Sequence, residues 1–382
     1  MAYNAVGQLK TSFAIGIILG LALNIGFAIV DRDGWGIDYN QFYSAGKLAG
    51  TGHLYDWQAL RKVELERGLP MPTGRLPVVA YGHKLLASLP YRTAHWIWLA
   101  LNLVALGVFA LVWPEADRRW MVLALVWSMP ATLLLLYGQD TPIWLMSCAA
   151  GLFLMKRERP WSAGAAFSLC ICKFHLALGI PVMLVAQKRW KTLIAGAVAG
   201  AVWLAVSFLI EGPNWVSGGL GMSRLPEFSP AANHMPTLFG LSVRLPWSTA
   251  VEIMAAVVVA ALLWRFSRQT TGLGMAGAAA AASGLLLARH AYANDAALLI
   301  PLLVFSIQRV QTPAWLRSWA LVLLSPVPVV LLASAGAAAG QLLILAFVPI
   351  ALVVLAAGRT GRAVEAAGEE FPKTDSARIG SL

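Results

Sequence analysis

The sequence predicts an all-α polytopic membrane protein. Of its 382 residues, 59% are hydrophobic and only 12% are charged, and its mean hydropathy is +0.69. Soluble domains carry about 25% charged residues, so this composition cannot build a water-facing surface. The apolar runs are too long for the strands of a membrane barrel, whereas helices satisfy their own backbone hydrogen bonds inside a bilayer.

The apolar runs predict a bundle of about 12 transmembrane segments. The first run, 11–30, is longer than the roughly 7–15 residues of a signal-peptide core, so we expect a retained signal anchor. Several later runs are shorter than the ~20 residues of a perpendicular span, so some segments should be short or broken. The later runs are 93–113, 120–137, 142–155, 161–172, 174–186, 192–210, 248–266, 271–288, 296–307, 316–334 and 341–357. Residues 77–89 are too short and polar to span and are expected at the interface.

Charge then predicts the orientation of the bundle. Short basic clusters alternate with loops that are not basic, and the positive-inside rule places the basic clusters in the cytoplasm. With Lys10 and the tail, these clusters hold 17 Lys and Arg against 7 Asp and Glu, while the rest of the chain holds 12 against 11. This asymmetry accounts for most of the net charge of +11 without a nucleic-acid partner. Both termini are therefore expected in the cytoplasm, and loops 31–77 and 211–247 in the periplasm of a bacterial inner membrane.

The chain is expected to form one membrane domain, 1–358, followed by a polar, disordered cytoplasmic tail, 359–382. The three cysteines lie in apolar runs and are expected to be inert packing residues. The sequence has no paired-carboxylate metal motif, no G-x-G-x-x-G and no P-loop, so we predict neither a metal site nor a cofactor. The remaining option for a metal is a group formed by Asp31, Asp33 and Asp38.

Residues 161–186 are expected to form an interrupted hairpin. The segment lies between two basic, cytoplasmic clusters and must cross an even number of times, yet two full spans need ~40 residues. A broken or half-depth hairpin would place Lys173 and His175 near its tip. Non-helical backbone at this depth is tolerated where protein or a water-filled cavity covers it. We therefore expect a cavity that contains a lysine.

Loop 31–77 is polar and aromatic, and its Asp38-Tyr39-Asn40-Gln41 has the D-x-x-Q form of a capping box. This pattern predicts a short helix that begins at Asp38 and ends before Gly50-Thr51-Gly52. One interpretation is that Asp38 only caps this helix, which would lower the pKa of its carboxyl group. The other is that an ionised Asp38 also accepts a proton from a substrate hydroxyl.

Five motifs, taken in order, resemble those of family 87 glycosyltransferases, which are membrane enzymes of the GT-C fold. Asp38, Tyr43 and Ala45, followed by Gly52-His53-Leu54-Tyr55 when spacing is relaxed at Thr51, resemble D-F-x-x-Y-x-A…G-x-x-L-Y. The other similar segments are Gly138-Gln139-Asp140, Ala163-Gly164 with Lys173, Asn233 to Leu238, and Tyr292-Ala293-Asn294-Asp295 followed by Pro301. The chain departs from the family at Asp140, Phe174 and Tyr81-Gly82-His83, where Asn, Pro and Tyr-Pro-Pro are usual. These departures leave the donor open.

The resemblance implies a reaction. An inverting transfer would move a sugar, mannose by the family-level expectation, from a polyprenyl-phosphate donor to a hydroxyl of a lipid or glycan acceptor. Asp38 would be the general base, a role worth roughly 10²–10⁴-fold in rate. The departing phosphate needs positive charge, for which Lys173 is the first candidate and Arg289 the second, because intramembrane charges indicate function. The residues expected to contact the sugar or the acceptor are Tyr43, Gln139, Asp140, His175, Asn233, His234, His290 and Asp295.

Two other classes of function remain as alternatives. A transporter or flippase needs polar residues along a path on both sides of the midplane, often within inverted repeats. In this chain the polar loops lie on one predicted side and no repeat is visible, which favours an enzyme. A structural subunit of a membrane complex would require neither Asp38 nor Lys173.

Overall fold

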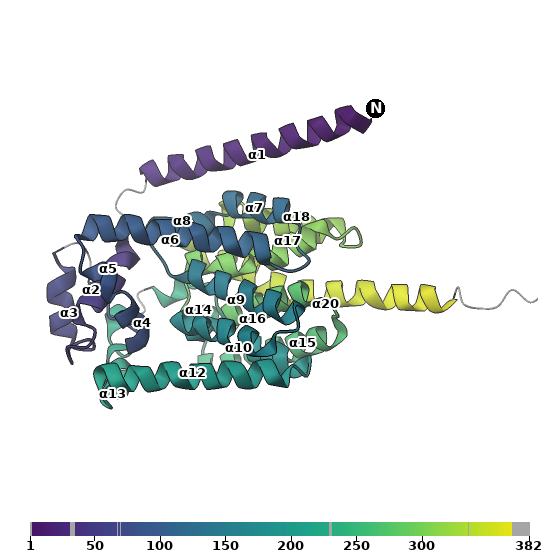
Figure 1. Ribbon diagram of the computed structural model, residues 1–382. Helices are drawn as coiled ribbons and strands as arrows, with labels where there is room; N and C mark the ends of the chain where they lie inside the picture. Colours follow the sequence, from purple (N-terminus) through teal and green to yellow (C-terminus); the bar gives the residue numbers. More distant parts are fainter. Residues whose placement is uncertain are drawn as a thin grey trace, which may run out of the picture.

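The computed structural model describes the backbone of residues 2–30, 35–66, 68, 70–228, 231–334 and 336–368. The side chains of 2–10, 30 and 358–368 lie outside this description. Every regular element in the described ranges is a helix (Figure 1). The predicted class, an all-α polytopic membrane protein, is confirmed.

Five helices are long and apolar enough to cross a membrane. They are α1 (Ala2–Val30), α6 (Tyr91–Val112), α12 (Trp190–Glu211), α15 (Ser248–Gln269) and α20 (Ala337–Gly368). Large apolar side chains on these helices point away from the protein, such as Ile18 and Val104, which are 64% and 63% exposed. In a membrane protein such faces are covered by lipid, which explains why large apolar side chains are exposed there.

Three pairs of helices pass the same test only together, because each pair is bent at a short break. They are α7 (Arg118–Trp127) with α8 (Met129–Tyr137), bent by 67°, α18 (Ala314–Leu324) with α19 (Val327–Ala333), bent by 60°, and Pro160–Ala177 with α11 (Gly179–Ala186), bent by 113°. The described helices thus provide five spans, or up to eight if each bent pair is one span. The predicted number of about 12 segments also depends on shorter apolar helices, which are α9 (Thr141–Lys156), α16 (Leu273–Leu287) and the continuous Ala293–Gln308.

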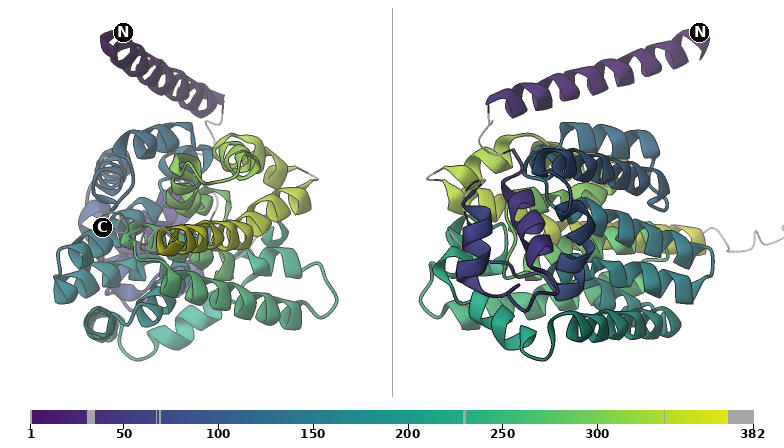
Figure 2. Two further views of the ribbon diagram at one scale, coloured as in Figure 1. Left: turned by 90° about the vertical axis from the view of Figure 1, so that its right-hand side faces the viewer. Right: turned by 60° about the vertical axis from the view of Figure 1, so that its left-hand side comes forward.

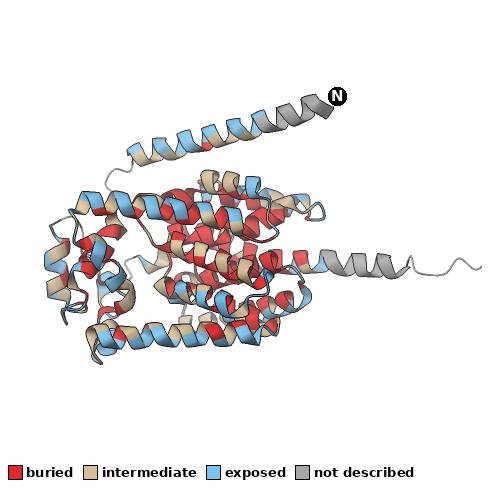
Figure 3. Cartoon of the chain, viewed as in Figure 1, coloured by how far each residue is buried: buried red, intermediate tan, exposed pale blue. Residues whose placement is uncertain are grey.

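Helix α16 lies at the centre of the bundle and is buried along nearly its whole length (Figure 3). Its alanines and glycines allow other backbones to approach closely, as is usual for packing inside membranes. A Cβ at Gly284 would lie 2.1 Å from the carbonyl oxygen of Leu176, and a Cβ at Gly179 would lie 2.0 Å from that of Ala280. Small residues therefore hold the 160–186 segment against α16.

The elements of the first polar loop and of the segment 77–89 gather at one end of the molecule (Figures 1 and 2). The loop contains α2 (Ile37–Leu48) and α3 (Trp57–Glu64), and the segment contains α4 (Pro77–Gly82) and α5 (Lys84–Ala87). Helix α13 (Trp215–Met222) from the second polar loop lies with them. Helix α1 runs toward this end and α20 runs away from it. The two predicted polar loops therefore share one face of the bundle.

The second polar loop continues through three further short helices, which are η3 (Pro226–Phe228), η4 (Ala232–His234) and α14 (Leu238–Ser242). At the other end of the chain, α20 extends to Gly368, past the expected domain boundary at residue 358. The remainder of the expected tail, residues 369–382, lies outside the described residues.

Candidate active site

Asp38 lies in the first turn of α2 but does not cap it. The helix begins at Gly36, which has a left-handed φ of 70°, and the structure gives this end no side-chain cap. The Asp38 carboxylate instead accepts a hydrogen bond from Gln139 Nε2 (2.6 Å), and Gln41 Nε2 donates to the carbonyl oxygen of Pro72 (2.7 Å). The predicted capping box is therefore wrong, because the helix starts earlier than the D-x-x-Q pattern suggests. The predicted helix end before Gly50 is confirmed.

A tight turn after α8 brings Gln139 to Asp38. Gly138 has a φ of 74°, which glycine adopts without strain, and a Cβ there would lie 2.7 Å from Tyr39 Cβ. The turn is held in place by the indole nitrogen of Trp98, which donates to the Gly138 carbonyl oxygen (2.7 Å). The close contact between this turn and α2 aligns the amide of Gln139 with the carboxylate of Asp38.

Next to Gln139, four charged side chains form a buried network, which we call the charge cluster: Arg75, Asp140, Lys173 and Asp295. Asp140 Oδ1 lies 3.0 Å from Arg75 Nη2 and 3.7 Å from Lys173 Nζ. Lys173 Nζ lies 2.6 Å from Asp295 Oδ1. The four side chains are between 3% and 12% exposed. Two cations and two anions balance, as a buried network requires.

Neutral groups complete the cluster. Thr141 Oγ1 donates to Asp295 Oδ1 (2.6 Å), and Arg75 Nη1 donates to the carbonyl oxygen of Cys172 (2.7 Å). The second carboxylate oxygen of Asp140 is buried without a hydrogen-bond partner among the described residues. A substrate hydroxyl or a water molecule is the kind of group that would satisfy it.

Lys173 owes its position to the break in the 161–186 segment. The helix α10 (Pro160–Ser168) continues into the 3₁₀-helix η2 (Leu169–Ala177), inside which Lys173 has a non-helical backbone (φ −134°, ψ 64°). The predicted break is confirmed by this kink and by the 113° bend. The ammonium group does not project freely from the tip, since Asp295 and Asp140 both contact it.

Two histidines and a tyrosine border the charge cluster. The rings of His175 and His290 are 6.1 Å apart, and Tyr292 packs edge-on against His290 at 5.3 Å. Burial lowers the pKa of His290 to about 4, so this side chain is neutral at pH 7. Burial raises the pKa of the Tyr292 hydroxyl, and the negative charges of Asp38 and Asp295 raise it further.

The electrostatics of Asp38 place it within reach of the charge cluster. Loss of solvation raises the pKa of its carboxyl group to about 6. The hydrogen bond from Gln139 opposes this rise, and so do the positive charges of Lys173 and Arg75, while Asp295 adds to it. A half-buried carboxylate of this kind is ionised at pH 7 yet more basic than an exposed aspartate, which suits a general base.

Four residues expected in the site lie elsewhere. Tyr43 is buried in a small core and donates to the Leu89 carbonyl oxygen (2.7 Å). The side chain of Arg289 is 67% exposed, pairs with Glu252 (3.1 Å) and lies over the ring of Phe239. These neighbours of Tyr43 and Arg289 belong to other parts of the fold than the charge cluster. Asn233 and His234 anchor the second polar loop to the last helices. The Asn233 carbonyl oxygen accepts a hydrogen bond from Gln341 Nε2, and His234 Nδ1 is hydrogen-bonded to the Leu332 carbonyl oxygen.

Sequence reasoning missed Arg75, which no motif marks. The available signal was its charge, because a basic residue in a loop predicted to be non-cytoplasmic is uncommon and calls for a partner. For the predicted alternative of a metal, no group of three metal-binding side chains occurs among the described residues. Asp31 and Asp33, which that alternative needs, lie outside the described residues.

An apolar groove approaches Asp38 from the membrane side. It lies between α1, α6, α7 and α8 and has a volume of about 670 Å³. Its described lining includes no Lys, Arg, Asp or Glu, and its Asn24 Oδ1 accepts a hydrogen bond from Thr132 Oγ1 (2.6 Å). Trp35 and His95 also line it, and His95 lies against Gly36, two residues before Asp38. The groove suits a hydrocarbon chain.

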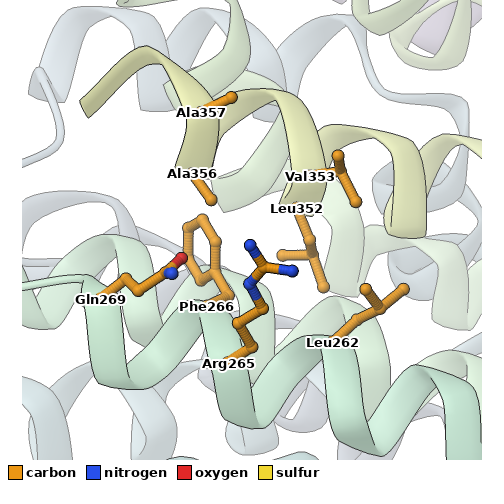
Figure 4. Close-up of a pocket in the computed structure, with 8 residues that line it drawn as sticks. All are labelled: Leu262, Arg265, Phe266, Gln269, Leu352, Val353, Ala356 and Ala357. Atoms are coloured by element: carbon orange, nitrogen blue, oxygen red, sulfur yellow. The ribbon is translucent and has the colours of Figure 1, made fainter. Parts of the chain in front are cut away.

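A smaller cavity of about 170 Å³ lies between α15 and α20 (Figure 4). Arg265 and Gln269 project toward α20 across its mouth. None of the residues that line it belongs to the charge cluster, so we do not assign it to the site.

The fold defines a polytopic membrane protein with a buried polar cluster joined to its loop-bearing end. The sequence model of Glycosyltransferase family 87 matches residues 77–289, more than half of the chain. The chain therefore belongs to glycosyltransferase family 87 and is a membrane glycosyltransferase. The matched part contains Arg75's partners Asp140 and Cys172, whereas Asp38 and Asp295 lie outside it. No curated protein and no solved structure gives a significant match.

Proposed function

We propose that this glycosyltransferase moves a sugar, mannose by the family-level expectation, from a polyprenyl-phosphate donor to a hydroxyl of a lipid or glycan acceptor on the periplasmic side. The observation that carries the proposal is the position of Asp38, whose half-buried carboxylate is held by Gln139, the residue next to Asp140 of the charge cluster. Burial raises the pKa of this carboxyl group to about 6, and the positive charges of Lys173 and Arg75 act on it. The transporter alternative is set aside because the family consists of enzymes.

In the proposed reaction the acceptor hydroxyl gives its proton to Asp38 while its oxygen attacks the anomeric carbon of the donor sugar. The bond between that carbon and the phosphate oxygen breaks, and polyprenyl phosphate leaves with the electron pair. Attack opposite the leaving group inverts the anomeric configuration. Gln139 keeps the carboxylate oriented, since it donates to Oδ2.

The departing phosphate needs cations in a site from which water is partly excluded. Arg75 and Lys173 supply them. Arg75 is the more exposed of the two, at 12% against 4%, so we assign it the first contact with the phosphate. A phosphate bound by Arg75 would share this guanidinium group with Asp140. The unpartnered oxygen of Asp140 could then accept a hydrogen bond from a sugar hydroxyl.

The lipid part of the donor requires an apolar surface next to these groups. The groove between α1, α6, α7 and α8 supports this requirement, because α8 contributes to its wall and then turns at Gly138 to reach Asp38. The chain passes from groove wall to charge cluster within a few residues, from Leu136 to Asp140. A prenyl chain in the groove would leave its sugar phosphate at the cluster.

The test compares Asp38→Asn with Asp56→Asn in purified protein supplied with polyprenyl-phosphate sugars and membrane lipid acceptors. Asp38→Asn keeps the size of the side chain but removes the base, so transfer should fall by roughly 100-fold or more. Asp56 lies in the same loop and caps α3 through hydrogen bonds from the Gln58 and Ala59 backbone. Asparagine also caps helices well, so Asp56→Asn should transfer sugar at the wild-type rate.

Near wild-type transfer by Asp38→Asn would remove Asp38 from the role of base. Loss in both variants would indicate damage to the loop and not to the chemistry. Detergent-solubilised protein is the appropriate sample, since sugar consumption there cannot be confused with transport.

A further inference from the structure

Arg75 reaches the charge cluster from a segment without regular structure, residues 70–76, which we call the strap. Among the described residues, no backbone-to-backbone hydrogen bond involves residues 70–75. Within the strap, the described residues provide a long hydrogen bond from the Arg75 backbone nitrogen to Thr73 Oγ1 (3.4 Å). The position of Arg75 therefore depends mainly on side chains that hold the strap from outside.

Three side chains provide that support. Glu64 Oε2 accepts a hydrogen bond from the Met71 backbone nitrogen (2.6 Å). Gln41 Nε2 donates to the carbonyl oxygen of Pro72, and the Tyr55 hydroxyl donates to that of Arg75 (2.5 Å). The strap is thus tied to α2, to α3 and to the residue that precedes α3 by two positions.

Glu64 is the unusual member of this group. It is fully buried (0% exposed). Among the described residues no cation pairs with it, and its Oε1 has no hydrogen-bond partner. A buried ionised carboxylate without a cation is costly, so burial favours the protonated form of Glu64, which can still accept the hydrogen bond from Met71. The rest of the proposed mechanism does not use Glu64.

We propose that Glu64 is a positioning residue for glycosyl transfer, which holds the strap so that Arg75 meets Asp140 and the Cys172 carbonyl beside Asp38. The path is continuous in the structure. Glu64 fixes Met71, the strap then passes Gly74, and the Arg75 guanidinium crosses the ring of Phe42 at 5.0 Å before it reaches Asp140. This inference rests on the proposed function for its effect on catalysis, but not for its effect on the strap.

The protonation of Glu64 supports this role. Burial raises the pKa of Glu64 to about 8, opposed only by the Met71 hydrogen bond. The charged side chains nearby in the fold do not act on it: Arg61, Lys62 and Glu66 next to it in the chain are exposed, Asp38 and Lys47 are on α2, and Arg75 is on the strap. The carboxyl group is therefore neutral at pH 7, and it would gain an unpaired charge above about pH 8, which weakens the packing of the strap.

The test uses Glu64→Gln and Glu64→Leu in the full-length, purified protein. Glutamine is neutral and keeps an oxygen that can accept from Met71, whereas leucine has a similar size and no acceptor. Hydrogen exchange of the peptide that contains Met71 reports on the strap without any substrate. We expect wild-type protection in Glu64→Gln and at least tenfold faster exchange of this amide in Glu64→Leu, with protection of α16 unchanged in both.

Activity then tests the link to catalysis. In the wild type, transfer should decline above about pH 8 as Glu64 ionises. Glu64→Gln should transfer sugar at the wild-type rate at pH 7 and should not show this decline. Glu64→Leu should raise the KM for the donor at least tenfold. The proposal would be overturned if the Met71 amide were equally protected in the wild type and in Glu64→Leu. It would also be overturned if Glu64→Gln and Glu64→Leu showed equally fast exchange of Met71 and an equal loss of transfer. If exchange behaves as expected but no variant alters transfer, the strap is supported and the catalytic role of Arg75 fails instead.

Discussion

Asp38 shows how a single side chain acquires its properties from neighbours distant in the sequence. Its carboxylate is bound by Gln139, 101 positions away, and feels the charges of Lys173 and Arg75. The local pattern around it suggested a capped helix end with a lowered pKa. The packed structure gives the opposite direction, because loss of solvation outweighs the hydrogen bond and the cations.

A pH profile tests this carboxyl group directly. The base must be ionised, so transfer should fall as the pH drops below about 6, by nearly tenfold per pH unit once well below the pKa. The same proton makes the folded protein relatively more stable in acid: the folded pKa lies above the ordinary value of 3.8, so this contribution is full below pH 4 and is lost as the pH rises through 6.

Gln139→Met should move the acidic limb of that profile to higher pH. The Gln139 hydrogen bond lowers the pKa of Asp38, and methionine has a similar size without a donor. Transfer measured between pH 5 and 9 should therefore require a higher pH to reach its plateau, and the plateau itself should be lower because Gln139 no longer orients the carboxylate. An unchanged limb would mean that Asp38 does not set it.

At the scale of the elements, the contact between α16 and the broken 160–186 segment positions Lys173. Backbone atoms of Leu176 lie so close to Gly284 that no side chain fits between them. Glycine here allows η2 to pack closely against α16. At this depth Lys173, the non-helical residue of η2, meets Asp295 from η5 (Ala293–Leu299), the element that follows α16. Loss of one partner of a buried ion pair destabilises a protein by about 3–5 kcal/mol.

Gly284→Ala should therefore destabilise the protein and reduce transfer. The added Cβ would lie 2.1 Å from the Leu176 carbonyl oxygen, and such overpacking costs about 1–3 kcal/mol or more. We expect a lower Tm in detergent and weaker transfer, since η2 must shift and carry Lys173 with it.

The matched control is Gly200→Ala on α12, where a new Cβ would meet no atom within 4 Å. This variant should unfold at the wild-type temperature or slightly above it, because alanine favours helix over glycine by up to about 1 kcal/mol. A Tm for Gly284→Ala equal to that of Gly200→Ala would contradict the close contact.

At the scale of the whole molecule, the proposed chemistry depends on which side of the membrane the α2–α5 end faces. The fold groups the two polar loops at this end (Figure 1), but the grouping alone does not distinguish the periplasm from the cytoplasm. The charge asymmetry of the sequence predicts that this end faces the periplasm.

Single cysteines test the orientation. Thr51→Cys and Lys188→Cys both replace exposed residues, the first at the α2–α5 end and the second in a basic cluster. In intact spheroplasts an impermeant thiol reagent should label Thr51→Cys and spare Lys188→Cys until the membrane is opened. The wild type measures the background from the native cysteines, of which Cys148 and Cys170 are buried and Cys172 is partly buried. The reverse pattern would place Asp38 in the cytoplasm and exclude a periplasmic donor.

Much of the site could be predicted from the sequence, and the part that could not has a common cause. Asp38, Gln139, Asp140, Lys173, His175, His290 and Asp295 were all expected, and the structure brings them together. Arg75 was not, because it belongs to the strap, which has neither periodicity nor a motif. Tyr43 was expected from a motif and Arg289 from its charge. Packing turns these side chains toward Leu89 and Glu252 instead, and neither the motif nor the charge predicts this packing.

The sequence by itself determined the class of the protein, the sidedness we expect for its loops and the break in the 161–186 segment, because hydropathy, charge and length act locally along the chain. Only the tertiary structure decided which polar residues meet. Lys173 and Asp295 are 122 positions apart and Arg75 and Asp140 are 65 apart. Their pairing follows from helices that pack through small residues and bring these buried charges together.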